Sequence, residues 1–323
     1  SRINTVTTRH PAVEAGGLSF TGQSGWATEY VLTNGNDLGL GFCSVVSSGN
    51  QADLTIADYL NYFADDPETK FIGAYVEGFK TGKNFFAAAR KAARQKPVIM
   101  WKAGRTNTGA QFTKSHTGSM ASDAAVTGAA LRQAGVEEAV GIEDLMDGLI
   151  AFNSPILPRG RRVGIVVDTG GIGVAACDAC ETMGLETPSL PASVQQELRD
   201  YYRQYLPPFA GIANPVDLVW APPGMEIDIY TRSMEIMAPY VDAFIVAYYP
   251  LPHTHEILAR FLAEIRDRLQ KPILSVPPYG HFMQPFMRLS NRLGIPSFES
   301  MERAVRALVR LVRRAEWLKG MEG

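Results

Sequence analysis

Cysteine is scarce in this sequence, with three among 323 residues. Cys43 lies in an apolar run typical of a buried strand, where a thiol is ordinarily inert. Cys177 and Cys180 have a redox-like spacing, but they fall inside a predicted helix rather than at a helix start, where thiols become reactive. The sequence therefore predicts neither a disulfide framework nor a thiol redox centre, and it indicates a reducing, cytoplasmic compartment.

Long apolar runs and a charge excess of one sign are also missing. No stretch is long and apolar enough to span a bilayer, and none has the features of a signal peptide. The formal net charge is -2, which gives no electrostatic reason to expect nucleic acid or a membrane as a partner.

Several common catalytic and binding motifs are absent as well. Neither GxGxxG nor GxxxxGK[ST] occurs, so dinucleotide binding and Walker-type triphosphate binding have no positive support, and no GxSxG indicates a serine hydrolase. Among the five histidines, His253 and His255 have an H-x-H spacing without an obvious third ligand. No metal site is predicted, because a metal would need further ligands.

What the sequence does contain is a regular alternation of apolar runs and amphipathic stretches. The runs are nearly continuous in apolar residues, as strands buried on both faces should be, and the alternation predicts a parallel sheet with right-handed crossovers. The strands expected in the first half are residues 16–22, 39–47, 70–78, 96–104 and, more weakly, 136–142; the helices are 26–35, 54–66, 83–95, 121–135 and 142–153.

The second half repeats this pattern after a proline-containing, basic stretch at residues 153–162. The boundary is placed there, giving domains 1–154 and 155–323, and both are predicted to be doubly wound α/β domains. The strands expected here are residues 161–171, a weak 185–191, 241–250, 271–278 and a short 294–300; the helices are 172–184, 191–204, 225–239, 253–270, 284–294 and 301–318.

Each half opens with a glycine-rich turn between its first strand and first helix: TGQSG at 21–25 and DTGGIG at 168–173. Small residues there let backbone N–H groups approach an anion, and the helix dipole favours negative charge. A tight strand–helix turn without a ligand explains the same residues equally well. The candidate phosphate-binding residues are Gln23, Ser24, Gly25, Gly170, Gly171, Ile172 and Gly173.

Two residues at predicted strand ends carry reactive side chains. Glu77 ends the third strand, where it is either a solvated carboxylate or a group that orients an imidazole. His116 follows the fourth strand in a loop of small residues, and an imidazole can act as a covalent nucleophile. Its neighbours Ser115, Thr117, Gly118 and Ser119 complete the candidate histidine loop.

Two further loops follow predicted strands or precede helices. In the loop at 47–55, Asn50 and Asp53 are either helix caps or crevice-lining groups. In the proline-rich loop at 214–223, Asn214 and Asp217 are candidates for the same crevice, and Asp217 alternatively caps or positions the backbone.

Taken in order, these stretches resemble the NDP-forming acyl-CoA synthetases, the relatives of succinyl-CoA synthetase. The resemblance covers nearly the whole chain, and SHTGSM after KAGRT is its most specific part. It implies two flavodoxin-like (succinyl-CoA synthetase-like) domains. It also implies that His116 carries a phosphoryl group, that Glu77 orients it, and that the two helix starts bind the phosphohistidine from either side.

The resemblance also implies what else the reaction needs. CoA, ATP or ADP, Mg²⁺ and a small carboxylic acid would be substrates of the complete enzyme, with no tightly bound cofactor. The family usually adds a CoA-binding domain and an ATP-grasp domain, and no stretch of this sequence resembles either. We therefore expect this chain to be an incomplete acid–thiol ligase that works with those partners in an oligomer.

Two other interpretations stay open from the sequence. A non-catalytic flavodoxin-like binding or scaffold subunit of a CoA ligase complex would keep the same fold, and a flavin-binding protein would share the domain architecture. The intact histidine, glutamate and glycine turns favour the enzyme.

Overall fold

The computed structural model describes residues 13–109, 111–112, 123–222, 224–249, 251–277 and 280–322. The chain divides into two compact units, residues 1–153 and 154–323. His116 and its neighbours Ser115, Thr117, Gly118 and Ser119 lie outside the described residues.

The first unit is built on a five-stranded parallel sheet in the order β2-β1-β3-β4-β5. Its strands are β1 (Ala15–Gly22), β2 (Phe42–Ser47), β3 (Phe71–Val76), β4 (Val98–Lys102) and β5 (Glu137–Glu138). Its helices are α1 (Gly25–Asp37), α2 (Ile56–Asp65), α3 (Gly82–Gln95), α5 (Ala124–Ala134) and α6 (Ile142–Phe152).

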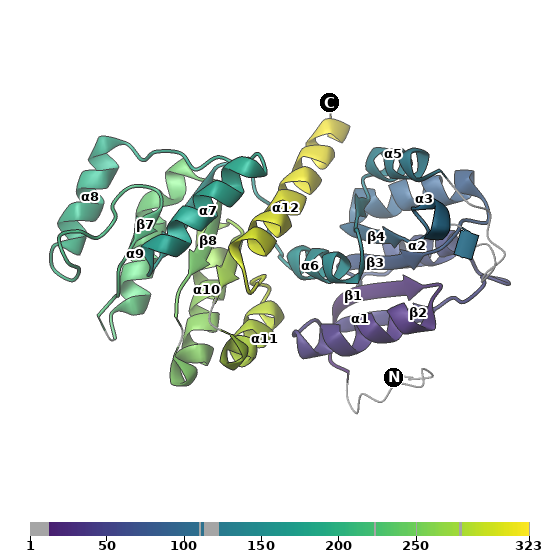
Figure 1. Cartoon of the computed structure of the whole chain (residues 1–323), viewed down its shortest axis with the longest axis horizontal. Helices are drawn as coiled ribbons and strands as arrows, with labels where there is room; N and C mark the ends of the chain where they lie inside the picture. The colour runs from purple at the N-terminus through teal and green to yellow at the C-terminus, as the bar shows by residue number, and fades with distance from the viewer. Residues whose placement is uncertain are drawn as a thin grey trace. The chain divides into compact units, whose positions relative to one another are not determined.

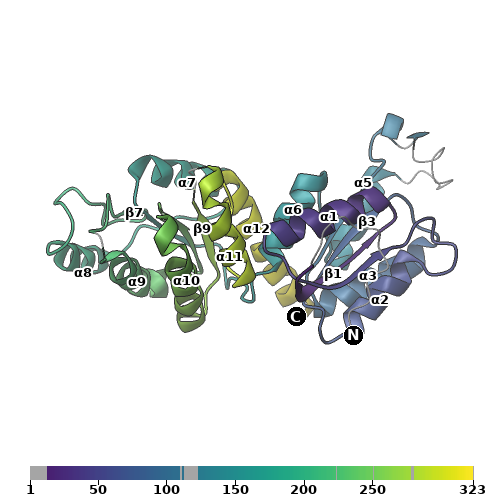
Figure 2. The ribbon, with the colours of Figure 1, turned by 90° about the horizontal axis from the view of Figure 1, so that it is seen from below.

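Helices cover both faces of this sheet. Within the unit, α1 and α6 lie on one face and α2 and α3 on the other (Figures 1 and 2). Every residue of β3 is buried, which explains why FIGAYV is apolar or small throughout rather than alternating. The strand order reverses between β1 and β3, and in an open α/β sheet the ligand crevice lies outside the carboxyl ends of the strands at that point.

The second unit has a four-stranded parallel sheet in the order β7-β6-β8-β9. Its strands are β6 (Val163–Val167), β7 (Val216–Asp217), β8 (Ala243–Ala247) and β9 (Ile273–Val276). Its helices are α7 (Gly170–Thr182), α8 (Ala192–Tyr202), α9 (Glu226–Met237), α10 (His255–Leu269), α11 (Gln284–Arg292) and α12 (Met301–Glu322), with short 3-10 turns η1 (Ala238–Tyr240), η2 (Pro252–Thr254) and η3 (His281–Met283).

This unit is also layered around its sheet. Helices α7 and α12 lie together on one side, and α9 and α10 lie on the other (Figure 2). All residues of β6, β8 and β9 are buried. The reversal of strand order falls between β6 and β8, so the crevice expected for this unit lies at the carboxyl ends of those two strands.

The prediction of two doubly wound parallel-sheet domains is confirmed. Three details of the second half were wrong. The stretches at 185–191 and 294–300 contribute isolated bridges at Glu186 and Ser297 instead of strands. The loop at 214–223 contains the edge strand β7. Sequence analysis did not predict this strand, because proline residues lie on either side of it.

Candidate functional site

Gln23 joins the ends of β1 and β3, at the reversal point of the first sheet. Its backbone N–H donates to the Tyr75 carbonyl at 3.1 Å. Its side-chain Oε1 accepts from the backbone N–H of Glu77 and, at 3.0 Å, from that of Gly78. The buried amide of Gln23 therefore fixes the backbone that presents Glu77.

Helix α1 begins directly after Gln23. Ser24 is its N-cap, and the hydroxyl oxygen accepts from Ala27 N–H at 3.4 Å. Gly25 is exposed, and a Cβ added to it would meet no atom within 4 Å. The first turn of α1 holds no acidic residue, so no carboxylate of that turn competes with an external anion for the helix dipole.

Glu77 lies in a buried polar cluster at the carboxyl ends of β3 and β4. It is 7% exposed, and its Oε1 accepts from the Tyr75 hydroxyl at 3.2 Å. Burial raises the pKa of Tyr75 well above its usual value, and the charge and hydrogen bond of Glu77 raise it further. The phenol therefore stays a proton donor to the carboxylate.

Lys102, the last residue of β4, is a buried cation at the same edge of the sheet. It is 4% exposed, and its Nζ donates to the Ala103 carbonyl at 2.5 Å. Burial lowers the pKa of Lys102, and the charge of Glu77 offsets part of that effect. Sequence analysis missed this residue, although a lysine inside the apolar run PVIMWKAG was a visible signal.

The histidine loop leaves from this same edge of the sheet. Its predicted phosphoryl carrier, His116, lies outside the described residues, between Phe112 and Asp123. On the far side of the loop, Asp123 caps α5 by accepting from the N–H groups of Ala125 and Val126 at 2.8 and 3.1 Å. The described chain thus fixes the two ends of the loop, one after β4 and the other at α5.

In the loop after β2, the helix-cap alternative for Asn50 and Asp53 is wrong, and their place in the crevice stays a prediction. Asn50 and Asp53 are exposed, and neither is the N-cap of α2, which is Thr55 in a capping box with Asp58. The buried member is Gln51, whose φ is 54°. Its side chain donates to the Gly78 carbonyl at 3.2 Å and accepts from Ile56 N–H at 2.8 Å.

Gln51 also lines a small pocket between the starts of α2 and α3. The other lining residues are Thr55, Ile56, Ala57, Phe79, Lys80, Thr81, Asn84 and Phe85. Because Gln51 binds Gly78, the residue after Glu77, this pocket adjoins the backbone that holds the carboxylate.

In the second unit, Asp168 occupies the position that Gln23 has in the first. Its Oδ2 accepts from the backbone N–H of Tyr249, just after β8, at 2.8 Å, and its Oδ1 accepts from the Thr169 hydroxyl at 3.0 Å. Burial raises the pKa of Asp168, with a further contribution from the charge of Asp217.

Helix α7 starts at Gly170, beside that second carboxylate. A Cβ on Gly170 would lie 2.8 Å from Asp217 Oδ2, whereas one on Gly171 would meet nothing within 4 Å. The other oxygen of Asp217 accepts from Val219 N–H at 2.9 Å. It thereby holds Val219 at a φ of 60°, which is unusual for a β-branched residue and typical of strain near functional sites.

The remaining candidates around α7 are also placed. Ile172 is half-buried, and Gly173 is buried, with an added Cβ 3.4 Å from Pro215. Asn214 acts on the sheet: its Oδ1 accepts from Ile165 N–H at 2.9 Å and its Nδ2 donates to Val163 carbonyl at 2.8 Å. Asn214 therefore continues the hydrogen bonding of β6 beyond the start of β7.

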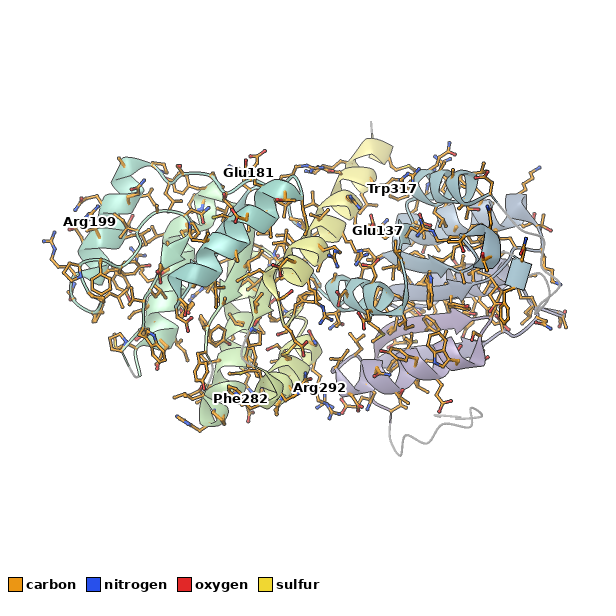
Figure 3. The ribbon with its side chains drawn as sticks, in the orientation of Figure 1. Glu137, Glu181, Arg199, Phe282, Arg292 and Trp317 are labelled. Carbon is orange, nitrogen blue, oxygen red and sulfur yellow. The ribbon has the colours of Figure 1, made fainter. Side chains whose placement is uncertain are left out.

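Aromatic side chains follow the same edge of the second sheet. Trp220, after β7, is 71% exposed and lies 6.4 Å from Tyr249, after β8; Tyr249 lies 5.7 Å from Phe282 in η3, between ring centroids. Figure 3 labels Phe282 at the margin of this unit, near α11.

Metal and thiol chemistry gain no support from the described part of the chain. It contains no group of three or more His, Cys, Asp or Glu side chains arranged to hold a metal ion. All three cysteines are free thiols, and burial raises the pKa of Cys180 to about 12, which makes it unreactive. None of the described helices combines the length and apolarity needed to cross a membrane.

The geometry defines a class of protein: two doubly wound units, each with a glycine-rich helix start at the reversal point of its sheet. Comparison with known families narrows that class. Residues 15–152 match the succinyl-CoA ligase-like flavodoxin domain, and residues 163–276 match the ligase-CoA domain. The chain belongs to the NDP-forming acyl-CoA synthetase family, the relatives of succinyl-CoA synthetase.

Individual relatives agree with this assignment. The alpha subunit of ADP-forming acetate–CoA ligase II of Pyrococcus furiosus is 34% identical over 94% of this chain and 66% of its own length. A trans-feruloyl-CoA synthase from an unknown prokaryotic organism is 31% identical over 91% of this chain and 42% of its own. The chain thus spans about two thirds of the first relative and less than half of the second.

A solved structure is similar over nearly the whole chain. It is the dinucleotide-forming acetyl-coenzyme A synthetase 1 of Candidatus Korarchaeum cryptofilum in complex with phosphate and ADP. The similarity has a TM-score of 0.81 with 30% identity, and it covers 97% of this chain and 68% of that one.

Proposed function

We propose that this chain is the phosphohistidine-bearing part of an NDP-forming acyl-CoA synthetase. In the proposed sequence, His116 attacks the terminal phosphorus of ATP and ADP leaves. A substrate carboxylate then takes the phosphoryl group from His116 to form an acyl phosphate. The thiolate of CoA attacks the acyl carbon, so that phosphate leaves and a thioester forms; every step is reversible.

The observation that carries this proposal is the buried Glu77, held by Gln23 at the reversal point of the first sheet. A carboxylate fixed there suits the orientation of an imidazole from the loop that follows β4, because it can accept from one ring nitrogen and leave the other to react. The dipole of α1, whose first turn holds no acidic residue, favours the negative charge of a phosphoryl group.

The partners follow from the reaction. ATP, its Mg²⁺ and CoA need binding sites, which we assign to an ATP-grasp domain and a CoA-binding domain acting with this chain in an oligomer. We further propose that the enzyme works in the cytoplasm, in keeping with its three free thiols. Relatives named for acetate and trans-feruloyl substrates support a carboxylic acid substrate.

The test is phosphorylation of the chain together with its ATP-grasp partner. We expect label from γ-phosphate-labelled ATP on His116, stable in base and lost in acid, and removed by a carboxylic acid plus CoA. His116→Ala should abolish the label, whereas His253→Ala, in the second unit, should keep it. A labelled His116→Ala variant, or an unlabelled wild-type complex that still forms thioester, would refute the assignment and favour a scaffold role for this chain.

A further inference from the structure

Trp26 is an exposed aromatic residue at the start of α1. It is the second residue of that helix, directly after Gly25, and it is 57% exposed. In an α-helix the Cα–Cβ bond tilts toward the N-terminus, so a long side chain in the first turn covers the start of its own helix. The indole of Trp26 therefore presents an apolar surface beside the glycine-rich turn.

Contacts between rings connect Trp26 to the buried carboxylate of Glu77. Its indole lies 6.3 Å from that of Trp101 in β4, and Trp101 lies 4.9 Å from Tyr75 in β3, between ring centroids; both pairs are edge-to-face. Trp101 and Tyr75 are partners in the parallel register, and the Tyr75 hydroxyl donates to Glu77 Oε1 at 3.2 Å. Trp26 thus lies on the same face of the sheet as Glu77, at its carboxyl edge.

Packing within the chain covers only part of this indole. Tyr30, one turn further along α1, lies 5.9 Å from Trp26, between ring centroids, and Trp101 lies against it from the sheet. More than half of the residue stays exposed despite these two neighbours. The carboxyl edge of an open α/β sheet is where ligands bind, so this exposed surface borders the crevice expected for the first unit.

The proposed function brings the substrate to this place. Its carboxylate takes the phosphoryl group from His116, which that function assigns to Glu77 and the start of α1. The rest of the acid then extends from the helix start over the neighbouring surface, and Trp26 is the large exposed apolar residue there.

We propose that Trp26 is a specificity-determining residue that contacts the acyl part of the substrate and favours acids with an aryl group. An aryl ring gains from burial against the indole and also from offset or edge-to-face stacking, whereas a saturated ring gains from burial alone. A two-carbon acid such as acetate is too short to gain from either. This assignment of the substrate class rests on the proposed function.

The test compares three acids with the complete enzyme, ATP and CoA: phenylacetate, its saturated counterpart cyclohexylacetate, and acetate. In Trp26→Ala we expect kcat/KM for thioester formation to fall by about tenfold with phenylacetate, about threefold with cyclohexylacetate and less than about twofold with acetate. Trp26→Phe, which keeps a ring, should stay within about threefold of the wild type with phenylacetate.

Tyr62→Ala is the matched control, because Tyr62 is an aromatic residue of the same unit that is 63% exposed on α2, across the sheet from α1. It should leave the ratio of the three kcat/KM values unchanged. If Trp26→Ala lowers all three values equally, the indole acts on the fold or on a partner domain, and the proposal is overturned. Equal losses with the two ring acids alone would overturn the aryl class.

A binding measurement needs no activity. Saturation-transfer NMR should show magnetisation passing from the full chain to the ring protons of phenylacetate in the wild type and in Tyr62→Ala, but not in Trp26→Ala. A chain that binds phenylacetate through Trp26 and is never phosphorylated would refute the proposed function alone. Normal phosphorylation of His116, with an acid preference that does not depend on Trp26, would refute the inference alone.

Discussion

The first strands of the two units end in the same arrangement, but with a neutral amide in one unit and a carboxyl group in the other. In the first unit, the neutral side chain of Gln23 accepts backbone N–H groups after β3. In the second, Asp168 accepts the N–H of Tyr249 after β8. Both side chains hold together the strands between which the order reverses, so the geometry is shared although TGQSG and DTGGIG differ.

The charges around the two helix starts are what differ. Beside α1, the charge of Glu77 acts on the buried cation Lys102 and raises its pKa against the effect of burial. Beside α7, Asp168 and Asp217 both carry carboxylates, and Asp217 lies against the first helical residue. A helix start favours anions. At α7, the protein's own carboxylate already offsets part of the positive potential of the helix N-terminus. The two starts, which the sequence treated as equivalent phosphate sites, are therefore unequal.

The largest expected effect comes from exchanging the carboxylates for amides. Glu77→Gln should slow phosphorylation by about a thousandfold, equivalent to about 4 kcal/mol, because an amide can present its N–H₂ to the imidazole instead of an acceptor. Asp168→Asn should slow it less than about tenfold, since the amide oxygen can still accept from Tyr249 N–H. Quench-flow with labelled ATP and the complete enzyme measures both rates; equal losses would show that the units are electrostatically equivalent.

The next largest effect is a loss of stability, expected when a structural asparagine is replaced but not when an exposed asparagine is replaced. Asn214→Ala should lower the free energy of unfolding of the second unit by about 3 kcal/mol, because Ile165 N–H and the Val163 carbonyl lose their partner. The matched Asn50→Ala, at an exposed position of the first unit, should change it by less than about 0.5 kcal/mol. Urea unfolding monitored by hydrogen exchange of peptides from each unit gives both values. A small loss of unfolding free energy in Asn214→Ala would instead favour the predicted role of Asn214 in the crevice.

A third comparison sets a carboxylate paired with an arginine, Asp242, against one that accepts from a backbone N–H and a hydroxyl, Asp168. Asp242 is buried, which by itself would raise its pKa, but hydrogen bonds from the side chain and backbone of Arg162 hold the pKa below its usual value. Its stabilisation is therefore present above the unfolded pKa and is lost as pH falls through the lower folded value. For Asp168, with a raised pKa, ionisation instead destabilises the fold at neutral pH.

Two amide variants test that difference in sign. At pH 7, Asp242→Asn should destabilise the second unit by about 1–2 kcal/mol, a modest value because the Arg162 side chain is half-exposed. Asp168→Asn should be neutral or stabilising by up to about 1 kcal/mol. The Asp242 difference should shrink below about pH 4, as the pH falls towards its lower folded pKa, whereas the Asp168 difference should shrink above about pH 4, as the pH falls through its raised folded pKa. Melting temperatures from pH 3 to 8 check this; destabilisation by both variants at pH 7 would contradict the raised pKa of Asp168.

Most of the fold was predictable because buried parallel strands have sequences that are continuously apolar. FIGAYV and AFIVA are unambiguous in this respect. The strand β7 was not predictable, because its two residues lie between prolines and polar groups and show no periodicity of their own. It forms because these residues pair in register with Val166 and Val167. Tertiary pairing, rather than local preference, decided it.

The site was predictable only in part, for a related reason. Strand ends and glycine turns locate Glu77 and Gln23 in the sequence, but nothing local shows that Gln23 binds the Glu77 backbone across 54 residues. Lys102 was not singled out in the sequence, and only the structure shows that this last residue of β4 is buried. Gln51 was passed over for Asn50, since exposure cannot be read from a loop of polar residues.

The smallest expected effect probes the two helix starts most directly. Gly25 and Gly170 are each the first residue of their helix. Gly25→Ala places its Cβ in open space and should stabilise the first unit by about 0.5 kcal/mol, because alanine has less freedom to lose on folding. Gly170→Ala pushes Asp217 and weakens its hold on Val219, so it should destabilise the second unit by about 1 kcal/mol.

Gly171→Ala is the control for this last prediction, because its Cβ, one residue along the same helix, meets nothing within 4 Å. It should behave like Gly25→Ala, and only Gly170→Ala should weaken the protection of Val219 N–H against hydrogen exchange. If all three substitutions stabilise equally, Asp217 moves aside freely, and the acidic character that distinguishes α7 from α1 does not constrain the helix start.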